Sequence, residues 1–183
     1  NLIEKSKKKF GSLSLLINNA SKFENDNIAK LNIDSWDSHN NINLKAPLFL
    51  SKDFSKQMKR NAPGLIINII DQRIFFPNPE FISYTSSKQS LMWLTQTLAQ
   101  ALSPQIRVCA IGPGPTLQGA RQSKKDFENQ SLSTPLMVGS NPEEIYQAVK
   151  FIIDIPSFTG QMITLDGGEH LDWIKKENKN FKD

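Results

Sequence analysis

A tyrosine and a lysine four residues apart form the first pair in this sequence whose types and spacing suit acid–base chemistry. In a helix, this spacing puts Tyr84 and Lys88 on one face, about 5–6 Å apart at Cβ. A phenol ordinarily has a pKa of about 10, and a neighbouring ammonium stabilises the phenolate. We therefore expect a lowered pKa for Tyr84 and a role in proton transfer near neutral pH. The other interpretation is an amphipathic tyrosine that packs beside a solvated lysine.

Three more groups of polar or small residues follow short apolar runs. Residues 18–21 (Asn-Asn-Ala-Ser) follow one run, Asp71 ends a second, and residues 113–116 (Pro-Gly-Pro-Thr) follow a third. If the runs are parallel strands, their carboxyl ends meet at one edge of the sheet, where the ligand crevice of an open α/β fold lies. We expect these groups and Tyr84 to surround one site.

The elements that must position these groups alternate along the chain. We predict strands at 13–18, 65–70, 106–111 and 161–166, and helices at 34–60, 81–102, around 123–129 and at 141–154. Pro47 must lie at a helix start or a kink, and Asn141 followed by Pro142 is typical of a helix start. Alternating strands and helices predict parallel strands joined by right-handed crossovers, an α/β layered sheet in one domain over residues 1–183.

Composition and charge exclude several classes of function. The net charge is +4, but the basic residues concentrate at 5–9 and 175–182, which indicates a solvated helix face and a frayed tail rather than a nucleic-acid surface. No apolar stretch approaches the roughly 20 residues of a membrane span. A single cysteine, Cys109, excludes an internal disulfide and favours the cytoplasm. His39 and His170 are isolated, so we expect no metal site and interpret both as surface or capping groups.

The order of the motifs resembles the short-chain dehydrogenase/reductase family. The matching residues are Asn18-Asn19-Ala20, Asn43-Leu44, Asp71, Tyr84 with Lys88, Pro113-Gly114, Thr159-Gly160 and Asp166-Gly167-Gly168. Together they span nearly the whole chain, and the ordered set is far more specific than any one piece. The resemblance implies a Rossmann-like three-layer fold, hydride transfer from NADPH (or NADH) to a small-molecule substrate, and a homo-oligomer.

The resemblance also implies a role for each matching residue. Tyr84 would be the general acid, and Lys88 would lower its pKa and bind the nicotinamide ribose. Asn43 would hold a water that links Lys88 to solvent; the other interpretation is a polar helix residue satisfied by a backbone carbonyl. The residues implied to contact the cofactor are Asn19, Ala20, Ser21, Tyr84, Lys88, Pro113, Gly114 and Thr116.

Two departures from the common family pattern narrow the subgroup. Asp71 stands thirteen residues before Tyr84, where most members have serine, and the first motif continues as Asn-Ala-Ser-x-Phe, ending at Phe23. This combination resembles the pteridine reductases and bacterial dihydromonapterin reductases. It implies that Asp71 helps to deliver protons to ring nitrogens, that Phe23 stacks on a pterin, and that Ser21 and Tyr84 also line the substrate site. The other interpretations are that Asp71 caps a loop and that Phe23 packs in the core or in the substrate loop.

A third departure is at the beginning of the chain. No Gly-x-x-x-Gly-x-Gly turn precedes Asn18, so we expect a truncated fold without its first βαβαβ half, in which 1–11 is a helix end and 174–183 a polar tail. The strand at 13–18 would then be an unpaired edge. The leading hypothesis is an NADPH-dependent reductase of a pterin-like C=N bond. The alternatives are a carbonyl reductase of the same family, a non-catalytic scaffold or interaction domain and, least supported, a nucleic-acid-binding protein.

Overall fold

A single parallel sheet organises the computed structural model, which describes residues 2–59, 62–76, 78–119 and 122–171. Its strands are β1 (Leu15–Asn18), β2 (Gly64–Ile69), β3 (Ile106–Pro113) and β4 (Met162–Leu165), and their spatial order in the sheet is β1-β2-β3-β4. Every neighbouring pair is parallel. The predicted α/β fold is confirmed, and all four strands overlap the segments predicted from the sequence.

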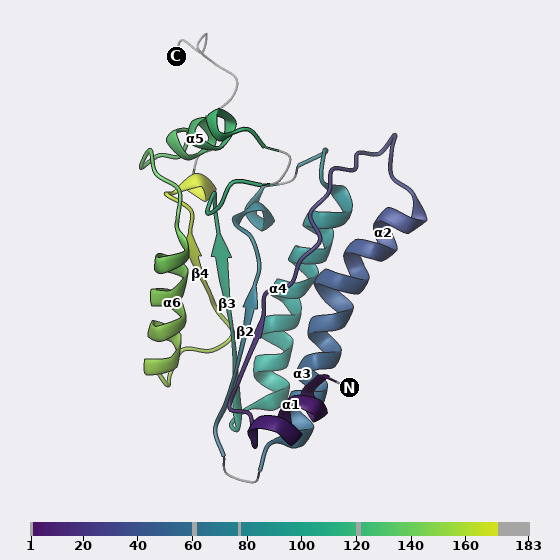
Figure 1. Ribbon diagram of the computed structural model, residues 1–183, viewed down its shortest axis with the longest axis vertical. Helices are drawn as coiled ribbons and strands as arrows, with labels where there is room; N and C mark the ends of the chain where they lie inside the picture. The colour runs from purple at the N-terminus through teal and green to yellow at the C-terminus, as the bar shows by residue number, and fades with distance from the viewer. Residues whose placement is uncertain (1, 60–61, 77, 120–121, 172–183) are drawn as a thin grey trace.

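Helices cover both faces of this sheet and make three layers (Figure 1). The helical elements are α1 (Leu2–Phe10), α2 (Ile33–Asn40), η1 (Asn41–Lys45), α3 (Ala46–Gln57), η2 (Gln72–Phe75), α4 (Ile82–Leu102), α5 (Lys124–Leu132), α6 (Pro142–Asp154) and η3 (Glu169–Leu171). In Figure 1, α3 and α4 lie on one side of the strands, α6 lies on the other, and α5 lies at the upper end, towards which the strands run.

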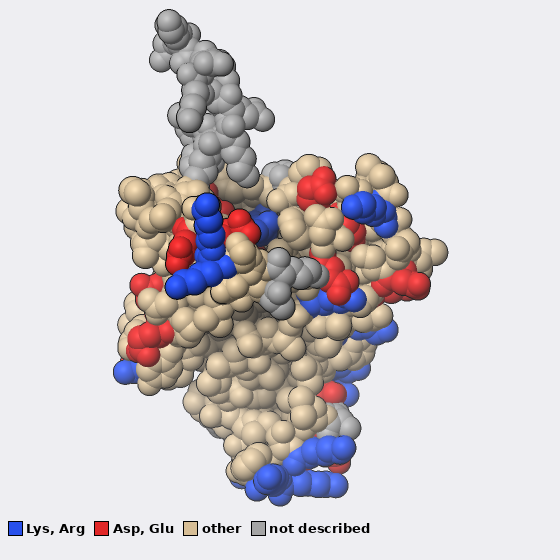
Figure 2. Space-filling model, turned by 45° about the horizontal axis from the view of Figure 1, so that its top comes forward, with Lys and Arg blue, Asp and Glu red and all other residues tan. Residues whose placement is uncertain are grey.

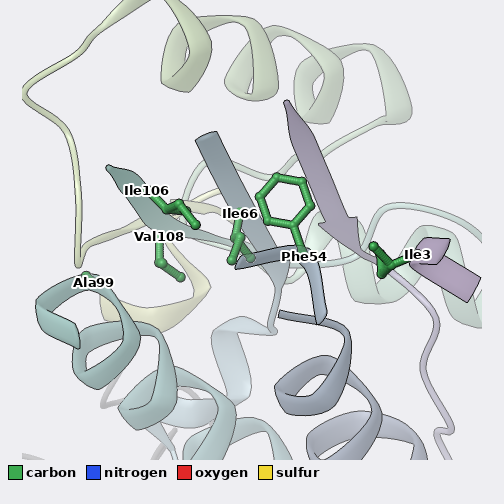
Figure 3. Close-up of a cluster of buried hydrophobic side chains, with 6 residues drawn as sticks. All are labelled: Ile3, Phe54, Ile66, Ala99, Ile106 and Val108. Carbon is green, nitrogen blue, oxygen red and sulfur yellow. The ribbon is translucent and has the colours of Figure 1, made fainter. Parts of the chain in front are cut away.

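The buried core explains why β2 and β3 are apolar along nearly their whole length. Both are central strands with a helix layer on each side, so side chains on both faces are buried. Figure 3 shows one of the core clusters, which joins three helices to the two central strands. Its members are Ile3, Phe54, Ile66, Ala99, Ile106 and Val108. Cys109 of β3 is fully buried on the other face, as a small apolar side chain.

The local start and stop signals act as the sequence indicates. Asn141 caps α6 by accepting a hydrogen bond from the Glu144 backbone N–H, and the Glu144 side chain accepts one from Asn141 in return. Pro47 lies in the first turn of α3, directly after the π-helical turn η1. The predicted helix at 34–60 is therefore three joined segments, because proline cannot donate the backbone hydrogen bond of a regular α-helix.

The surface features divide between the two ends of the molecule. The lysines in the last turn of α1, at positions 7–9, are exposed, as expected of a solvated helix face. They lie at the lower end, where Figure 2 shows basic side chains gathered, whereas acidic and basic side chains intermix around the upper end.

The predicted polar tail at 174–183 lies outside the described residues. At the sheet edge, β1 pairs only with β2 among the described strands, and Ile17 is 40% exposed.

The residues that the structure describes contain neither a membrane-spanning helix nor a cluster of metal-binding side chains. None of the helices there is long and apolar enough to cross a membrane. No group of three or more histidine, cysteine, aspartate or glutamate side chains in those same ranges could hold a metal ion. The polar residues at the carboxyl ends of the strands are the candidates for a functional site, because ligands of open α/β sheets bind at that edge.

Candidate active site

A carboxyl, a phenol and an ammonium converge where β2 ends against the first turns of α4. The Tyr84 hydroxyl donates a hydrogen bond of 2.5 Å to Oδ2 of Asp71, and Oδ1 of Asp71 accepts one of 2.8 Å from the backbone N–H of Arg73. The Lys88 ammonium lies 5.8 Å from the centre of the Tyr84 ring and donates to the carbonyl of Ile69 at 2.9 Å. Asp71 thus serves at once as the cap of η2 and as the partner of the phenol.

The electrostatics of this group differ from the expectation for Tyr84. Burial, together with the charge and hydrogen bond of Asp71, raises the pKa of Tyr84 well above its ordinary value. The predicted lowering is therefore wrong. Spacing alone suggested that Lys88 would act on the phenol, but the Lys88 ammonium donates to a main-chain carbonyl and the phenol to a carboxylate. Burial lowers the pKa of Lys88 to about 8, and burial raises the pKa of Asp71 although its hydrogen bonds oppose this.

Aromatic rings border the phenol of Tyr84, and Phe23 is one of them. The Phe23 ring meets the Tyr84 ring edge-on, with centroids 4.6 Å apart, and stacks on Phe81 at 4.8 Å with the ring planes 9° apart. Phe23 is 42% exposed, so it is not a core side chain. The Arg73 guanidinium lies close to both phenylalanine rings, 5.3 Å from Phe23 and 5.0 Å from Phe81. The site therefore presents an exposed aromatic ring next to the hydrogen-bonded Asp71 and Tyr84.

The Asn43 side chain joins the loop after β1 to helix α4. Its Oδ1 accepts hydrogen bonds from the Lys22 backbone N–H at 2.7 Å and the Ser21 hydroxyl at 3.2 Å. Its Nδ2 donates to the Lys22 carbonyl at 2.9 Å and the Ser87 hydroxyl at 3.0 Å. These bonds occupy both side-chain N–H groups. The bond to the Lys22 carbonyl fits the other interpretation of Asn43, a polar helix residue satisfied by a backbone carbonyl, and the role of Asn43 in holding a water stays a prediction.

The segment after β1 is held by a ladder of buried amides. Nδ2 of Asn18 donates to Oδ1 of Asn68 on β2 at 2.8 Å, and Nδ2 of Asn68 donates to the Thr95 hydroxyl on α4 at 2.9 Å. This ladder fixes the point at which the chain leaves β1. The exposed residues that follow it are Asn19, Ala20 and Ser21. Their side chains lie at the carboxyl end of the sheet, where the sequence places them.

The segment after β3 returns to the same edge of the sheet. Pro113 ends the strand, and the Thr116 hydroxyl donates to the Gly114 carbonyl at 2.9 Å and lies 2.6 Å from the Ser140 hydroxyl. A Cβ on Gly114 would lie 2.7 Å from the backbone Cα of Asp166, so only glycine fits at that position. The Pro-Gly motif thus has a packing reason that is independent of any ligand.

Both histidines lie in settings that the sequence did not indicate. His39 is fully buried: Nδ1 lies 2.9 Å from the Ser35 carbonyl, and Nε2 accepts a hydrogen bond from the Glu24 backbone N–H at 3.2 Å. The expectation of a surface role for His39 is wrong, because the loop after β1 folds over α2 and satisfies Nε2, while the carbonyl of Ser35 in α2 satisfies Nδ1. Nor is His170 isolated, since Nδ1 lies 2.8 Å from Oδ2 of Asp166.

Asp26 is a further positioning residue that sequence reasoning missed. Its carboxylate accepts hydrogen bonds from the Ser83 backbone N–H at 3.0 Å and the Ser35 hydroxyl at 2.8 Å. Burial acts against ionisation of Asp26, but these hydrogen bonds outweigh it and lower the pKa of the group. The residue before α4, Phe81, has no capping side chain, so Asp26 supplies the cap from a distant loop and fixes the turn that carries Tyr84. Sequence spacing holds no signal for a cap contributed from so far away.

Comparison with known proteins agrees with this geometry. Residues 1–129 match the family described as short chain dehydrogenase. The 3-oxoacyl-(acyl-carrier-protein) reductase FabG of Thermotoga maritima is 30% identical, over 91% of this chain and 70% of that protein. FolM alternative dihydrofolate reductase 1 from Brucella suis, solved in complex with NADP, is 44% identical with a TM-score of 0.93, over 99% of this chain and 72% of that one. The Brucella canis enzyme, also with NADP, has the same identity and TM-score over 99% of this chain and 71% of that one.

The family match covers well over half of the chain, and the ordered motifs occupy one edge of a parallel sheet as that fold requires. The chain therefore belongs to the short-chain dehydrogenase family of NAD(P)H-dependent oxidoreductases.

Proposed function

We propose that the protein reduces a C=N bond of a pterin-like ring, with NADPH as the hydride donor and Tyr84 as the proton donor. The observation that carries this proposal is the 2.5 Å hydrogen bond from Tyr84 to Asp71, next to the exposed ring of Phe23. The Brucella relatives, described as alternative dihydrofolate reductases in complex with NADP, support the same substrate class and cofactor. NADH is the alternative cofactor.

The surroundings of Lys88 fit the nicotinamide-ribose end of such a cofactor. The ammonium is 2% exposed and has three N–H donors, yet within the described residues it makes one hydrogen bond, to Ile69. Ribose hydroxyls would accept the others. We assign contacts on the adenosine side to Asn19 and Ala20, and contacts with the nicotinamide and phosphates to the backbone of residues 113–116. The cofactor, when bound, supplies the hydride.

Asp71 explains why a C=N bond suits this site better than a C=O bond. Asp71 becomes a carboxylate once its proton has passed to Tyr84, and a carboxylate beside the reacting bond repels the negative charge that develops on a carbonyl oxygen during reduction. The same carboxylate stabilises a ring nitrogen that has taken up a proton and carries positive charge. Replacement of the usual serine by Asp71 thus changes the preferred charge at the position of the accepting atom.

Tyr84 and Asp71 then divide the proton transfer between them. Tyr84 gives its hydroxyl proton to the ring nitrogen while the ring carbon gains the hydride, so that C=N becomes CH–NH. The phenolate left on Tyr84 regains a proton from the Asp71 carboxyl. The raised pKa of Asp71 lets this carboxyl carry a proton at higher pH than an exposed aspartate would. Solvent restores the proton of Asp71 and completes the cycle.

A second candidate is carbonyl reduction, which the similarity to the Thermotoga 3-oxoacyl reductase favours. Substitution of Asp71 by serine separates the two candidates. For the C=N reductase, Asp71→Ser should lower kcat/KM for a dihydropterin by about 100-fold or more, the usual range for loss of a general acid or its partner. Ketone reduction by the same variant should persist or rise. Unchanged dihydropterin reduction in Asp71→Ser, with NADPH consumption as the readout, would contradict the proposal.

We further propose that the protein works in the cytoplasm as a homo-oligomer. Trp93 on α4 is 63% exposed, and a second chain packed against α4 would cover it. Light scattering coupled to size-exclusion chromatography should report more than one chain per particle for the unaltered protein. Trp93→Glu should yield a smaller particle, and identical particle masses for both would contradict an interface at this residue.

A further inference from the structure

Arg73 places a positive charge at the edge of the candidate site. Its backbone N–H donates to the capping carboxyl of Asp71, and its side chain is partly exposed. Within the part of the chain that the structure describes, the guanidinium forms no hydrogen bond and no ion pair; its contacts are with two aromatic rings. A guanidinium has five N–H donors in a planar fork that matches carboxylate and phosphate oxygens. Contact with aromatic rings engages the charge but none of these donors.

The two distances locate the guanidinium on the flank of the aromatic stack. A cation over the face of Phe23 that points away from Phe81 would be much closer to Phe23 than to Phe81. The guanidinium carbon is instead slightly farther from Phe23, at 5.3 Å, than from Phe81, at 5.0 Å, while the rings are 4.8 Å apart. Arg73 therefore borders the aromatic pair from the side and does not lie on the side of Phe23 that points away from Phe81.

Arg73 is also within electrostatic reach of the reacting groups. Burial raises the pKa of Asp71 and of Tyr84, and the charge of Arg73 offsets a part of each rise. A substrate ring that lies against Phe23 and reaches Tyr84 would have its substituents near this cation. Lys88 approaches Tyr84 from its own helix and donates to the end of β2, so the two cations are held by different elements.

We propose that Arg73 is a specificity residue that pairs with an oxyanion substituent, a carboxylate or a phosphate, carried by the substrate. This inference rests on the proposed function, because it takes the substrate to lie between Phe23 and Tyr84. It goes beyond that function by naming the charge of the preferred substrate: a pterin with an anionic side chain over a neutral one. A hydrogen-bonded pair of this kind contributes about 1.5–3 kcal/mol, which corresponds to about a 10- to 150-fold effect on KM.

The test compares three substrates that share the ring: dihydrofolate with its carboxylates, dihydroneopterin monophosphate, and dihydrobiopterin, which is neutral. The protein is expressed from its complete reading frame, unaltered and as Arg73→Met, Arg73→Lys and Lys125→Gln, the last of which removes an exposed cation from α5 as a control for overall charge. Thermal unfolding of each variant establishes that it is folded. The anionic substrate whose KM rises more in Arg73→Met, the carboxylate or the phosphate, identifies which oxyanion Arg73 recognises.

The expected result for Arg73→Met is a KM for at least one anionic substrate that rises by about 10-fold or more relative to the KM of the neutral substrate, while any change in kcat is the same for all three substrates. Arg73→Lys should recover part of this selectivity and Lys125→Gln should keep all of it. An equal change for charged and neutral substrates, no change for any, or a change confined to the KM of NADPH would overturn the role of Arg73 alone. Failure of the unaltered protein to reduce any of the three would overturn the proposed function as well.

Discussion

Lys88 provides a test of the site in which stability, rather than activity, is the readout. The side chain is 2% exposed, and burial lowers its pKa from the ordinary 10.5 to about 8. This difference in pKa means that the free energy of unfolding is lower by about 3 kcal/mol at pH values where Lys88 is protonated in the folded protein. Lys88→Met removes the charge but also the hydrogen bond to the Ile69 carbonyl, at a cost of about 1 kcal/mol.

The sign of the effect changes with pH. Below about pH 8 the lysine is protonated in both the folded and the unfolded chain, and the folded state bears the full cost. Between about pH 8 and 10.5 the unfolded chain binds a proton that the folded chain does not, so the stability of the unaltered protein rises with pH relative to the variant. Lys88→Met should therefore be more stable by about 2 kcal/mol at pH 7 and less stable by about 1 kcal/mol near pH 10.5.

Urea unfolding of both proteins without cofactor, at several pH values from 7 to about 10.5, measures this difference. Lys56→Met, which removes an exposed lysine from α3, controls for the loss of one positive charge. A stability difference between Lys88→Met and the unaltered protein that stays constant across this pH range would refute the account of Lys88 as a buried ammonium.

Three further substitutions test other parts of the site. Gly114→Ala should lower the free energy of unfolding by about 1–3 kcal/mol in urea titration, because the new Cβ would lie 2.7 Å from the backbone of Asp166. Asn43→Ala should cost about 1–3 kcal/mol by the same measurement, and faster proteolysis of the loop after β1 should accompany it, since four hydrogen bonds are lost. Asp71→Asn should leave the stability at pH 8, measured by thermal unfolding, unchanged or higher. The raised pKa of Asp71 means that the folded state favours the protonated, neutral carboxyl. The stabilisation that protonation gives is lost as the pH rises through that pKa, and asparagine is neutral at every pH. A clear destabilisation of Asp71→Asn at pH 8 would contradict that direction.

Much of the fold follows from the sequence because its signals are local. The continuous apolar runs at β2 and β3 indicate strands buried on both faces, and the cap at Asn141 fixes the start of α6. The convergence of Asp71 with Tyr84 also follows, since strand ends of a parallel sheet share one edge. The sequence does not determine with which of several nearby groups each polar side chain forms its hydrogen bond.

The pKa of Tyr84 illustrates that limit. Helical spacing places Lys88 near the phenol, but spacing carries no information on burial or on the carbonyl of Ile69 that takes the ammonium. His39 and Asp26 were beyond reach for a related reason. Their partners are brought to them by the loop that folds back after β1, and only the tertiary structure shows that this loop caps α4 and buries the imidazole.

The most direct test of a C=N reductase is the substrate preference of the unaltered protein. The protein expressed from its complete reading frame is supplied with NADPH and either a dihydropterin or a 3-oxoacyl thioester, and kcat/KM is measured for each. The Asp71–Tyr84 pair beside Phe23 predicts a preference of about 100-fold or more for the dihydropterin. An equal or higher kcat/KM for the thioester would contradict the account.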